Sequence, residues 1–372
     1  MNNLVPVSAK DLLDLVAASL DADYTQVRRA CGRISTTVAE TDIDVAKQLK
    51  SFVRRSGVPL RASGYSISLP VDPKSRSPLV DEQPWPVNPA FLEDDCQQVF
   101  ATFVRDAKSI EKLQAHGLSG RMNLLLSGPP GTGKSLIAGH IAAQLGKPFF
   151  VIRLDSLVSS LLGDTAKNIR SAFEYVSQCG GVLFLDEFDA IAKLRDDKNE
   201  LGELKRVVNT LLQSIDALDD KAILLAATNH ANLLDSAVWR RFPYKMHLDK
   251  PGEDLRKELW AHFLNLDSNH INLTTPLAKI SEGLSGADIE EISIAARRTA
   301  VLNNSEIDIT ALTLSIINIR SNYPTTSVPR SISASERKYA AIQLVKTYGV
   351  SQVEAAACLG VSRQTIATYL KE

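Results

Sequence analysis

The sequence predicts an α/β protein whose central part is a parallel sheet with helices on both faces. From about residue 90 to 250, four apolar runs alternate with helix-like segments. The runs read NLLLSG, FFVIRL, GGVLFLDE and AILLAATN. Continuous apolar strands separated by helices are typical of parallel sheets that are buried on both faces. A glycine-rich loop after the first run and a purely helical stretch over 253–320 complete the prediction.

Length and composition limit the functions that are open to the chain. Its 372 residues leave room for two or three domains. The net charge of −1 provides no global basic field for nucleic acid. None of the four cysteines falls in a CxxC pair, which predicts reduced thiols rather than a metal site. We find no signal-peptide pattern and no apolar stretch of about 18 residues, so we expect a soluble, cytoplasmic protein without a membrane partner.

Proline content and helical periodicity divide the chain. Residues 1–69 are predicted to form a mainly helical domain, in which Leu12, Leu13, Val16 and Leu20 share one helical face behind the candidate N-cap Ser8. Six prolines in residues 70–89 predict an extended, semi-rigid connector. The expected divisions are 1–69, the connector 70–89, a large α/β subdomain 90–250, a helical subdomain 251–322, a linker 323–332 and a C-terminal helical unit 333–372.

A phosphate-binding loop is predicted between the first apolar run and the helix that follows it. Residues Gly128 to Ser135 fit the pattern G-x-x-x-x-G-K-[ST]. Gly131 and Gly133 allow the backbone N–H groups to curl toward phosphate oxygens, and the helix adds its positive end. Lys134 would reach the β- and γ-phosphates, and the Ser135 hydroxyl would ligate Mg²⁺.

Two acidic residues follow the third apolar run. Asp186 and Glu187 come at the carboxyl end of this predicted strand, where open α/β sheets bind ligands. Asp186 can hold Mg²⁺, and Glu187 can orient and deprotonate an attacking water. Alternatively, two acids at this position can simply start a helix. For Asp189, a role at a helix start and a catalytic role remain equally open.

Polar residues after the fourth apolar run extend the candidate site. Asn229 ends this predicted strand and could position the attacking water, although Asn is also a common turn residue. Arg240 and Arg241 follow, and a guanidinium fork suits phosphate well. Surface ion pairing is the alternative for both arginines, and their spacing does not separate the two interpretations.

Taken together, these stretches resemble the AAA family of the AAA+ ATPases over roughly residues 92–320. GPPGTGKS is similar to the Walker A motif, VLFLDE to Walker B and AATN to the sensor-1 strand. LLDSAVWRRF resembles the arginine-finger end of the second region of homology. GLSGADIEEISIAARRTA resembles the motif of the helical lid.

The resemblance implies a P-loop AAA+ module with a small helical lid, and ATP and Mg²⁺ as cofactors. It implies a homo-oligomeric ring, usually a hexamer, in which Arg240 and Arg241 act in trans on the γ-phosphate of the next subunit. Glu187 and Asn229 would complete catalysis. The nucleotide-binding residues implied are Gly128, Pro129, Pro130, Gly131, Thr132, Gly133, Lys134, Ser135, Leu136, Asp186, Gly286 and Ala287, with Ser135 and Asp186 as metal ligands.

Family members thread a polypeptide through the ring with a loop after the second strand. Leu161, Leu162 and Gly163 stand where an aromatic–hydrophobic–Gly triplet often occurs, but the aromatic residue is missing. A plain helix–loop packing segment is the alternative. Residues 195–202 would form a second pore-facing loop. The resemblance also implies that the N-terminal unit chooses the substrate or adaptor. The chain has no HExxH zinc-protease motif, so any degradation of substrates would need a separate protease.

The C-terminal unit is predicted to contain three helices. Ser351 with Glu354, and Ser333 with Glu336, fit the capping-box pattern. Gly360 allows a left-handed turn between the last two helices. The arrangement resembles the helix-turn-helix of resolvases and response regulators. In that fold the candidate DNA contacts would be Arg363, Gln364, Thr365 and Thr368.

Two functions remain open from the sequence. The first is ATP hydrolysis that drives protein remodelling or unfolding by an oligomeric ring. The second is a DNA-associated ATPase, recruited through the C-terminal unit and acting on DNA-bound complexes or in phage defence with an effector such as a protease. Residues 331–372 carry five basic and three acidic side chains, so a single unit would bind DNA weakly, and protein docking is its alternative role.

Overall fold

The computed structural model describes residues 7–20, 24–39, 43, 45–47, 70–71, 78–118, 120–153, 165–190, 203–219, 222–266, 271–320 and 332–371. Chain contacts divide it into two compact units, which are described separately. The first comprises Met1–Pro89, Val99–Ser127 and Ser135–Met246, and the second comprises Ala90–Gln98, Gly128–Lys134 and His247–Glu372.

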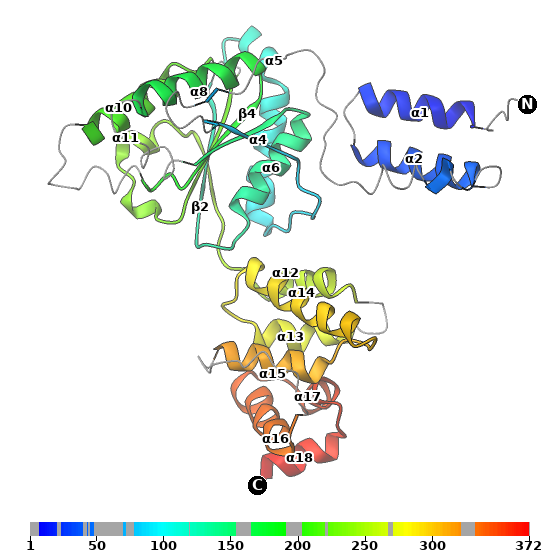
Figure 1. The fold of residues 1–372 in the computed structure, drawn as a ribbon. Coiled ribbons are helices and arrows are strands. Elements are labelled where there is room, and N and C mark those ends of the chain that lie inside the picture. The colour runs from blue at the N-terminus through cyan, green and yellow to red at the C-terminus, as the bar shows by residue number, and fades with distance from the viewer. Residues whose placement is uncertain are drawn as a thin grey trace, which may run out of the picture. The chain divides into compact units, whose positions relative to one another are not determined.

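The first unit is built on a six-stranded sheet with the strand order β1-β3-β4-β5-β2-β6 (Figure 1). The four predicted apolar runs form β2 to β5, and these strands pair in parallel. β1 pairs with β3 in the antiparallel direction, so the sheet is mixed and the expectation of a parallel sheet is corrected. The strands are β1 Asp81–Gln83, β2 Met122–Ser127, β3 Phe149–Arg153, β4 Val182–Asp186, β5 Ile223–Thr228 and β6 Tyr244–His247.

The antiparallel edge strand comes from the proline-rich segment that was expected to be a connector. Leu79 and Val80, just before β1, are buried against the sheet. The Trp85 indole donates to the Lys147 carbonyl at 3.0 Å. Proline is tolerated at sheet edges because an edge strand leaves one row of backbone groups without a ladder partner. An extended segment can therefore serve here as an edge strand.

Alternate side chains of each buried strand point to opposite faces of the sheet, so both faces must be covered. Helices provide this cover on each side. Leu125, Phe150 and Leu183 belong to the core cluster that also contains residues of α8 and α10. The helices of this unit after the proline-rich segment are α4 Asp94–Lys108, whose first residues fall in the second unit, α5 Ile110–Ala115, α6 Lys134–Leu145, α8 Thr165–Cys179, α10 Glu203–Asp216 and α11 Ser236–Trp239.

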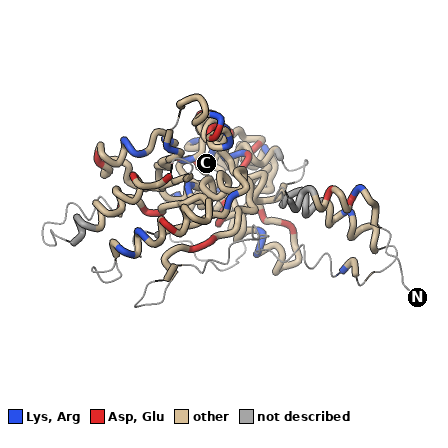
Figure 2. Tube along the Cα trace, turned by 90° about the horizontal axis from the view of Figure 1, so that it is seen from above, with Lys and Arg blue, Asp and Glu red and all other residues tan. Residues whose placement is uncertain are grey.

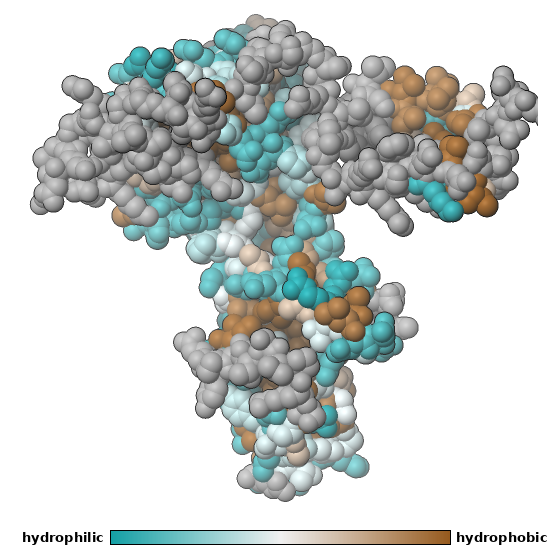
Figure 3. Space-filling view, viewed as in Figure 1, coloured by the Kyte–Doolittle hydropathy of each residue, from teal (hydrophilic) through white to brown (hydrophobic). Residues whose placement is uncertain are grey.

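The N-terminal helices α1 (Ala9–Leu20) and α2 (Tyr24–Val38) pack with a different face from the expected one. Leu12, Leu13 and Val16 of α1 are exposed, and apolar surface is visible on this helical pair in Figure 3. Leu15 instead packs on a small cluster that includes Ile34. Hydrophobic periodicity identifies an apolar face of a helix but does not show which face meets its neighbour. Here Leu15, which is outside the predicted face, makes the contact. Residues 40–42, 44 and 48–69 of the predicted N-terminal domain lie outside the described part of the chain.

The second unit is helical, and one hydrophobic core runs through all of it. The core contains Trp260 and Leu277 from the predicted lid, together with Leu344, Leu359 and Ile366 from the C-terminal segment. The helices are α12 Glu253–Leu264, η2 Ile271–Leu273, α13 Thr274–Ile280, α14 Gly286–Leu302, α15 Ile309–Arg320, α16 Ala334–Ile342, a π-helical turn η3 Gln343–Thr347, α17 Gln352–Leu359 and α18 Arg363–Lys371.

Local signals in the C-terminal segment formed as the sequence predicts. Both capping boxes are present, at Ser333 and at Ser351, and Gly360 has a φ of 62° in the left-handed region. Cys358 is fully buried, and this burial raises the pKa of its thiol to about 12. Its carbonyl accepts from the Thr310 hydroxyl of α15 at 3.3 Å. These contacts fix α17 against the predicted lid.

Charge is distributed without a single-sign block. Figure 2 shows Lys and Arg interspersed with Asp and Glu along the described trace. Among the described helices, none is both long enough and apolar enough to cross a membrane.

Candidate nucleotide-binding site

The glycine loop and the lid meet within the second unit. The loop continues directly from β2 and leads into α6, as the sequence predicts. Gly128, Gly131 and Gly133 all have positive φ, at 141°, 76° and 90°. A Cβ on Gly128 would collide with the carbonyl of Leu248, so this position requires glycine. The loop conformation is therefore one that only this glycine pattern adopts without strain.

Polar contacts hold the loop in shape. The Lys134 ammonium group is buried and donates to the carbonyls of Gly128 at 2.8 Å and Pro129 at 2.7 Å. The Thr132 hydroxyl donates to Pro129 at 2.9 Å. Ala287 at the start of α14 donates its N–H to the Gly131 carbonyl at 3.1 Å. The structure thus brings the predicted lid pair, Gly286 and Ala287, against the predicted phosphate loop.

Within the first unit, Ser135 and Asp186 lie together. The Ser135 hydroxyl is 3.4 Å from Oδ2 of Asp186, although the two residues are far apart in sequence. Asp186 ends β4, and Oδ1 of the same carboxylate accepts from the N–H of Glu187 at 2.9 Å. A hydroxyl and a carboxylate at this spacing are hard oxygen donors of the kind that Mg²⁺ prefers.

Glu187 occupies an unusual backbone conformation. Its φ is 55°, in the left-handed region, and its side chain is exposed. The turn is fixed by the next residue, because Phe188 is fully buried and donates its N–H to the Ala227 carbonyl of β5 at 2.8 Å. Such backbone strain persists only where the surrounding structure imposes it, and it is common at active sites. The geometry therefore favours a functional role for Glu187 over a simple helix start.

Asp189, which the sequence left open, connects two strand ends. This buried carboxylate accepts from the Thr228 hydroxyl and from the N–H of Asn229, both at 3.3 Å. Thr228 ends β5, and Asn229 follows it with an exposed side chain. Asp189 thus fixes the backbone of Asn229 relative to the turn that carries Glu187.

We predict that Asp189→Ala lowers both stability and turnover. The change leaves the buried Thr228 hydroxyl and the partly buried N–H of Asn229 without this acceptor, which costs about 1–3 kcal/mol. The backbone of Asn229 should also lose its contact with Asp189, so kcat should fall by more than the loss of folded protein explains. Urea unfolding and steady-state ATPase assays at a temperature where the variant stays folded would test this. A variant with full kcat would contradict the positioning role.

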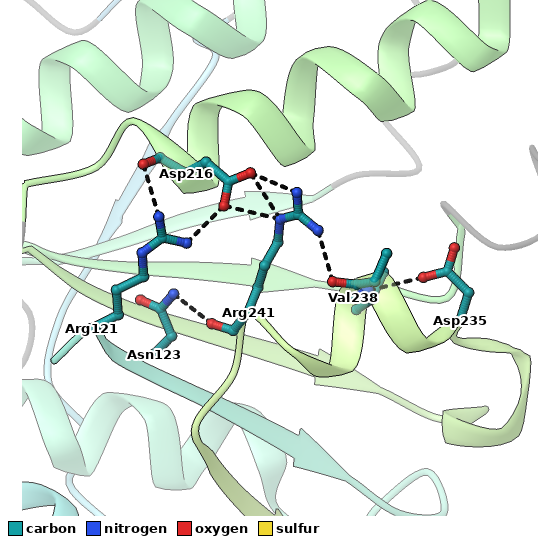
Figure 4. Close-up of polar contacts among 7 residues, drawn as sticks. Arg121, Asn123, Asp216, Asp235, Val238 and Arg241 are labelled. Carbon is teal, nitrogen blue, oxygen red and sulfur yellow. Dashed lines mark hydrogen bonds and ion pairs between the residues drawn. The ribbon is translucent and has the colours of Figure 1, made fainter.

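The two predicted arginines differ in their surroundings, and Arg240 is exposed. Arg241 forms an ion pair with Asp216 at 2.6 Å, and Arg121 contacts the same carboxylate at 2.7 Å (Figure 4). The Asn123 amide donates to the carbonyl of Arg241 at 2.8 Å. The sequence reasoning missed Asp216 and Arg121, which lie 25 and 120 positions from Arg241 (241 − 216 and 241 − 121) and fit no motif.

Other predicted site residues are described in part. Leu161, Leu162 and Gly163, and the charge run 195–202, lie outside the described residues. Arg363 and Gln364 are exposed in the first turn of α18. The N–H of Thr365 bonds to Ser362 at 3.1 Å, and the Thr368 hydroxyl bonds to the Gln364 carbonyl at 3.1 Å.

The residues present fit a magnesium nucleotide. Three positive-φ glycines shape a loop that runs into the N-terminus of α6, and this arrangement presents backbone N–H groups to phosphate. Lys134 adds a cation in the same loop, and Ser135 and Asp186 of the first unit are oxygen donors of the kind that Mg²⁺ prefers. Strand, glycine loop, helix and strand-end acid define a P-loop nucleotide-binding domain.

Comparison with known proteins specifies the kind of domain. Residues 124–250 match the ATPase family associated with various cellular activities (AAA). The described fold resembles the crystal structure of the FIGL-1 AAA domain, with a TM-score of 0.52 and 23% identity over 73% of this chain and 92% of that one. Residues 124–250 therefore match an AAA ATPase core, and the fold of the described residues agrees with that match.

Curated relatives share the core over part of their length. An uncharacterized AAA family ATPase of Sinorhizobium fredii is 41% identical over 55% of this chain and 62% of its own length. The proteasome-activating nucleotidase of Aeropyrum pernix is 29% identical over 63% of this chain and 60% of its own. The 26S proteasome regulatory subunit 6A of Saccharomyces cerevisiae is 30% identical over 62% of this chain and 56% of its own. The chain thus spans about 60% of the length of these relatives.

Proposed function

We propose that the chain hydrolyses ATP as a homo-oligomeric ring and uses the energy to remodel or unfold proteins. One observation carries the catalytic part of the proposal. Asp186 and Glu187 end a buried strand, with Asp186 beside Ser135 and with Glu187 held in a strained turn. This is the arrangement expected for a metal ligand followed by a general base.

Each residue has a distinct role in this proposal. The loop N–H groups and Lys134 bind the phosphates, while Ser135 and Asp186 hold Mg²⁺, which neutralises phosphate charge when it is bound. Glu187 orients a water molecule and accepts its proton. Asn229, fixed through Asp189, helps to orient the same water. Gly286 and Ala287, which adjoin the loop, leave room for the adenosine.

The position of Arg241 supports an oligomer. Its carbonyl lies beside Asn123, near the amino end of β2. Asp186 lies at the carboxyl edge of the sheet, level with Leu126, which is three residues or about 10 Å further along the strand. Arg241 is also tied to Asp216 at the opposite edge. This placement supports the proposal that an arginine of this segment acts on the γ-phosphate bound by a second copy.

The relatives support a protein substrate. Two of them are named as a proteasome-activating nucleotidase and as a proteasome regulatory subunit. We therefore propose that the ring acts on polypeptides, with Leu161, Leu162 and Gly163 gripping the chain and the N-terminal unit choosing it. A separate protease would degrade the product where degradation occurs. A cytoplasmic location is part of this proposal.

Exposed residues of the C-terminal unit support a second candidate, a DNA-associated ATPase. Arg363 and Gln364 lie exposed at the start of α18, and Gly360 forms the turn before it. Arginine and glutamine suit guanine and adenine edges in a major groove. Weak single contacts would require several copies in a ring to bind DNA together. Action on DNA-bound complexes or in phage defence would follow from such recruitment.

One experiment distinguishes the two candidates. The ATPase rate per subunit is measured against protein concentration, with and without an unfolded polypeptide or duplex DNA. We expect the rate per subunit to rise with concentration and to increase further with polypeptide. The Lys134→Ala variant, which should not bind ATP productively, serves as the negative control for the ATPase rate. Stimulation by DNA alone would favour the second candidate, and a rate equal to that of the negative control would contradict both.

A further inference from the structure

The short loop between α13 and α14, residues 281–285, leads from the helical core to the glycine loop. Its last residue, Ser285, begins α14 through a capping box with Asp288. A Cβ on Gly131 would lie 2.5 Å from the Ser285 hydroxyl oxygen, and the Gly131 carbonyl accepts from the N–H of Ala287 at 3.1 Å. The position of residues 281–285, which we call the lid loop, therefore determines where α14 meets the glycine loop.

Two cations hold the lid loop and the end of α13 from the side of α12. The last carbonyl groups of an α-helix have no partner within the helix, and basic side chains near them are favourable. Arg256 of α12 is buried, and its Nε donates to the Ala278 carbonyl at 2.7 Å. The Lys250 ammonium group donates to the Gly283 carbonyl at 2.6 Å. Each cation thus satisfies a backbone carbonyl that the helix itself leaves open.

A third cation reaches the same place from α15. Arg320, the last residue of α15, donates from Nη1 to the Ile280 carbonyl at the end of α13, at 3.2 Å. Its Nη2 also lies 3.9 Å from the carboxylate of Glu282 in the lid loop. The Glu282 side chain is 73% exposed, so this ion pair adds little, and the bond to the carbonyl is the main contact.

The C-terminal unit orients the guanidinium group of Arg320. Its Cζ lies 4.9 Å from the centroid of the Tyr348 ring, which is within the range of a cation–π contact. Tyr348 directly follows the π-helical turn η3, and its ring packs against the shared hydrophobic core. A ring face beneath the guanidinium group restricts the long side chain in advance, so less rotamer entropy is lost when Arg320 bonds to the carbonyl.

We propose that Arg320, supported by Tyr348, is a positioning residue for nucleotide binding. It holds the lid loop where Ser285 and Ala287 meet the glycine loop, and its loss lowers the fraction of molecules in this binding-competent arrangement. The inference rests on the proposed function, because it takes the glycine loop as the ATP site. It makes the C-terminal unit a support of that site, in addition to any partner that α18 recruits.

Arg320→Ala should weaken nucleotide binding by about 10-fold, as expected for the loss of one charge-assisted hydrogen bond. Calorimetric titration with a non-hydrolysable ATP analogue gives the Kd. At saturating ATP, kcat should fall much less than the affinity does, because bound nucleotide itself favours the competent arrangement. Without nucleotide, hydrogen exchange should be faster in the peptide that covers residues 281–288. Wild-type exchange there, or a wild-type Kd for the folded variant, would overturn the proposal.

Arg297→Ala is the matched control. Arg297 is exposed, and its Nη1 donates to the Phe263 carbonyl at the end of α12, also at 3.2 Å. The change removes a similar bond in the same helical unit but away from the lid loop, so the Kd should stay at its wild-type value. An equal loss of affinity in Arg297→Ala would overturn the specific role of Arg320, since general loosening of the unit would explain both results.

Two changes of Tyr348 test its support of Arg320. Tyr348→Phe keeps the ring face and should retain the affinity for the ATP analogue, whereas Tyr348→Leu should weaken it. In the Arg320→Ala background, Tyr348→Leu should cause no further loss, because the cation it supports is gone. A wild-type Kd for Tyr348→Leu would overturn the proposal even if Arg320→Ala did not fold. Failure of the wild-type protein to bind ATP would instead refute the proposed function, and hydrogen exchange would still show whether Arg320 holds the lid loop.

Discussion

Replacing Glu187 with Gln is expected to reduce ATP turnover by about 10²–10⁴-fold while ATP binding persists. The amide of Gln has nearly the shape of the carboxylate but does not accept a proton from water. Lys134 and the glycine loop, which bind the phosphates in our proposal, are untouched by the change. Phe188 holds the turn through its own N–H and its buried ring, so the turn should keep its shape.

Two measurements on the same protein check this expectation. Steady-state phosphate release gives kcat, and calorimetric titration with ATP gives the Kd of the variant. Glu174→Gln, a change of an exposed residue on α8, serves as the control and should keep wild-type values of both. If Glu187→Gln retained full turnover, another group would have to be the base. If it lost ATP binding too, Glu187 would have a structural role in the loop.

Truncation of Leu359 to Ala is expected to destabilise the whole second unit by about 2–5 kcal/mol. Leu359 is 1% exposed and belongs to the core that also contains Trp260 and Leu277. Removing a side chain from a shared core leaves a cavity that both sets of helices border. The damage should therefore extend from α17 to α12 and α13, and to the lid that adjoins the glycine loop.

Hydrogen exchange followed by mass spectrometry would locate the damage. Amides of α12 and α13 should exchange faster in Leu359→Ala, together with those of α17. Val353→Ala, on the same helix but 61% exposed, is the matched control and should change little. Faster exchange confined to α16, α17 and α18 would show instead that the C-terminal helices open independently, as a separate unit on a linker would.

The sequence was most informative where one local pattern determines the outcome. Each predicted apolar run became one of the strands β2 to β5, because a segment that must be covered on both faces needs unbroken apolar character. The glycine positions and both capping boxes formed for similarly local reasons. Asp186 and Glu187 followed from their place at the end of such a strand.

Longer-range features could not be predicted from those patterns. Edge pairing of β1 depends on how residues 78–83 meet β3, and proline content alone indicates only an extended chain. The exposure of Leu13 on α1 depends on which of two apolar faces α2 meets. The ion pairs of Asp216 join segments far apart in sequence. No short motif encodes a contact of this kind.

The left-handed turn at Glu187 has an evolutionary consequence. A non-glycine residue at such a φ costs on the order of 1–3 kcal/mol, so a chain selected only for thermal stability would replace it, most simply with glycine. A glycine there would relax the backbone and remove the carboxylate in the same step. Under the proposed role of Glu187 as the general base, stability and chemistry place opposite demands on this position.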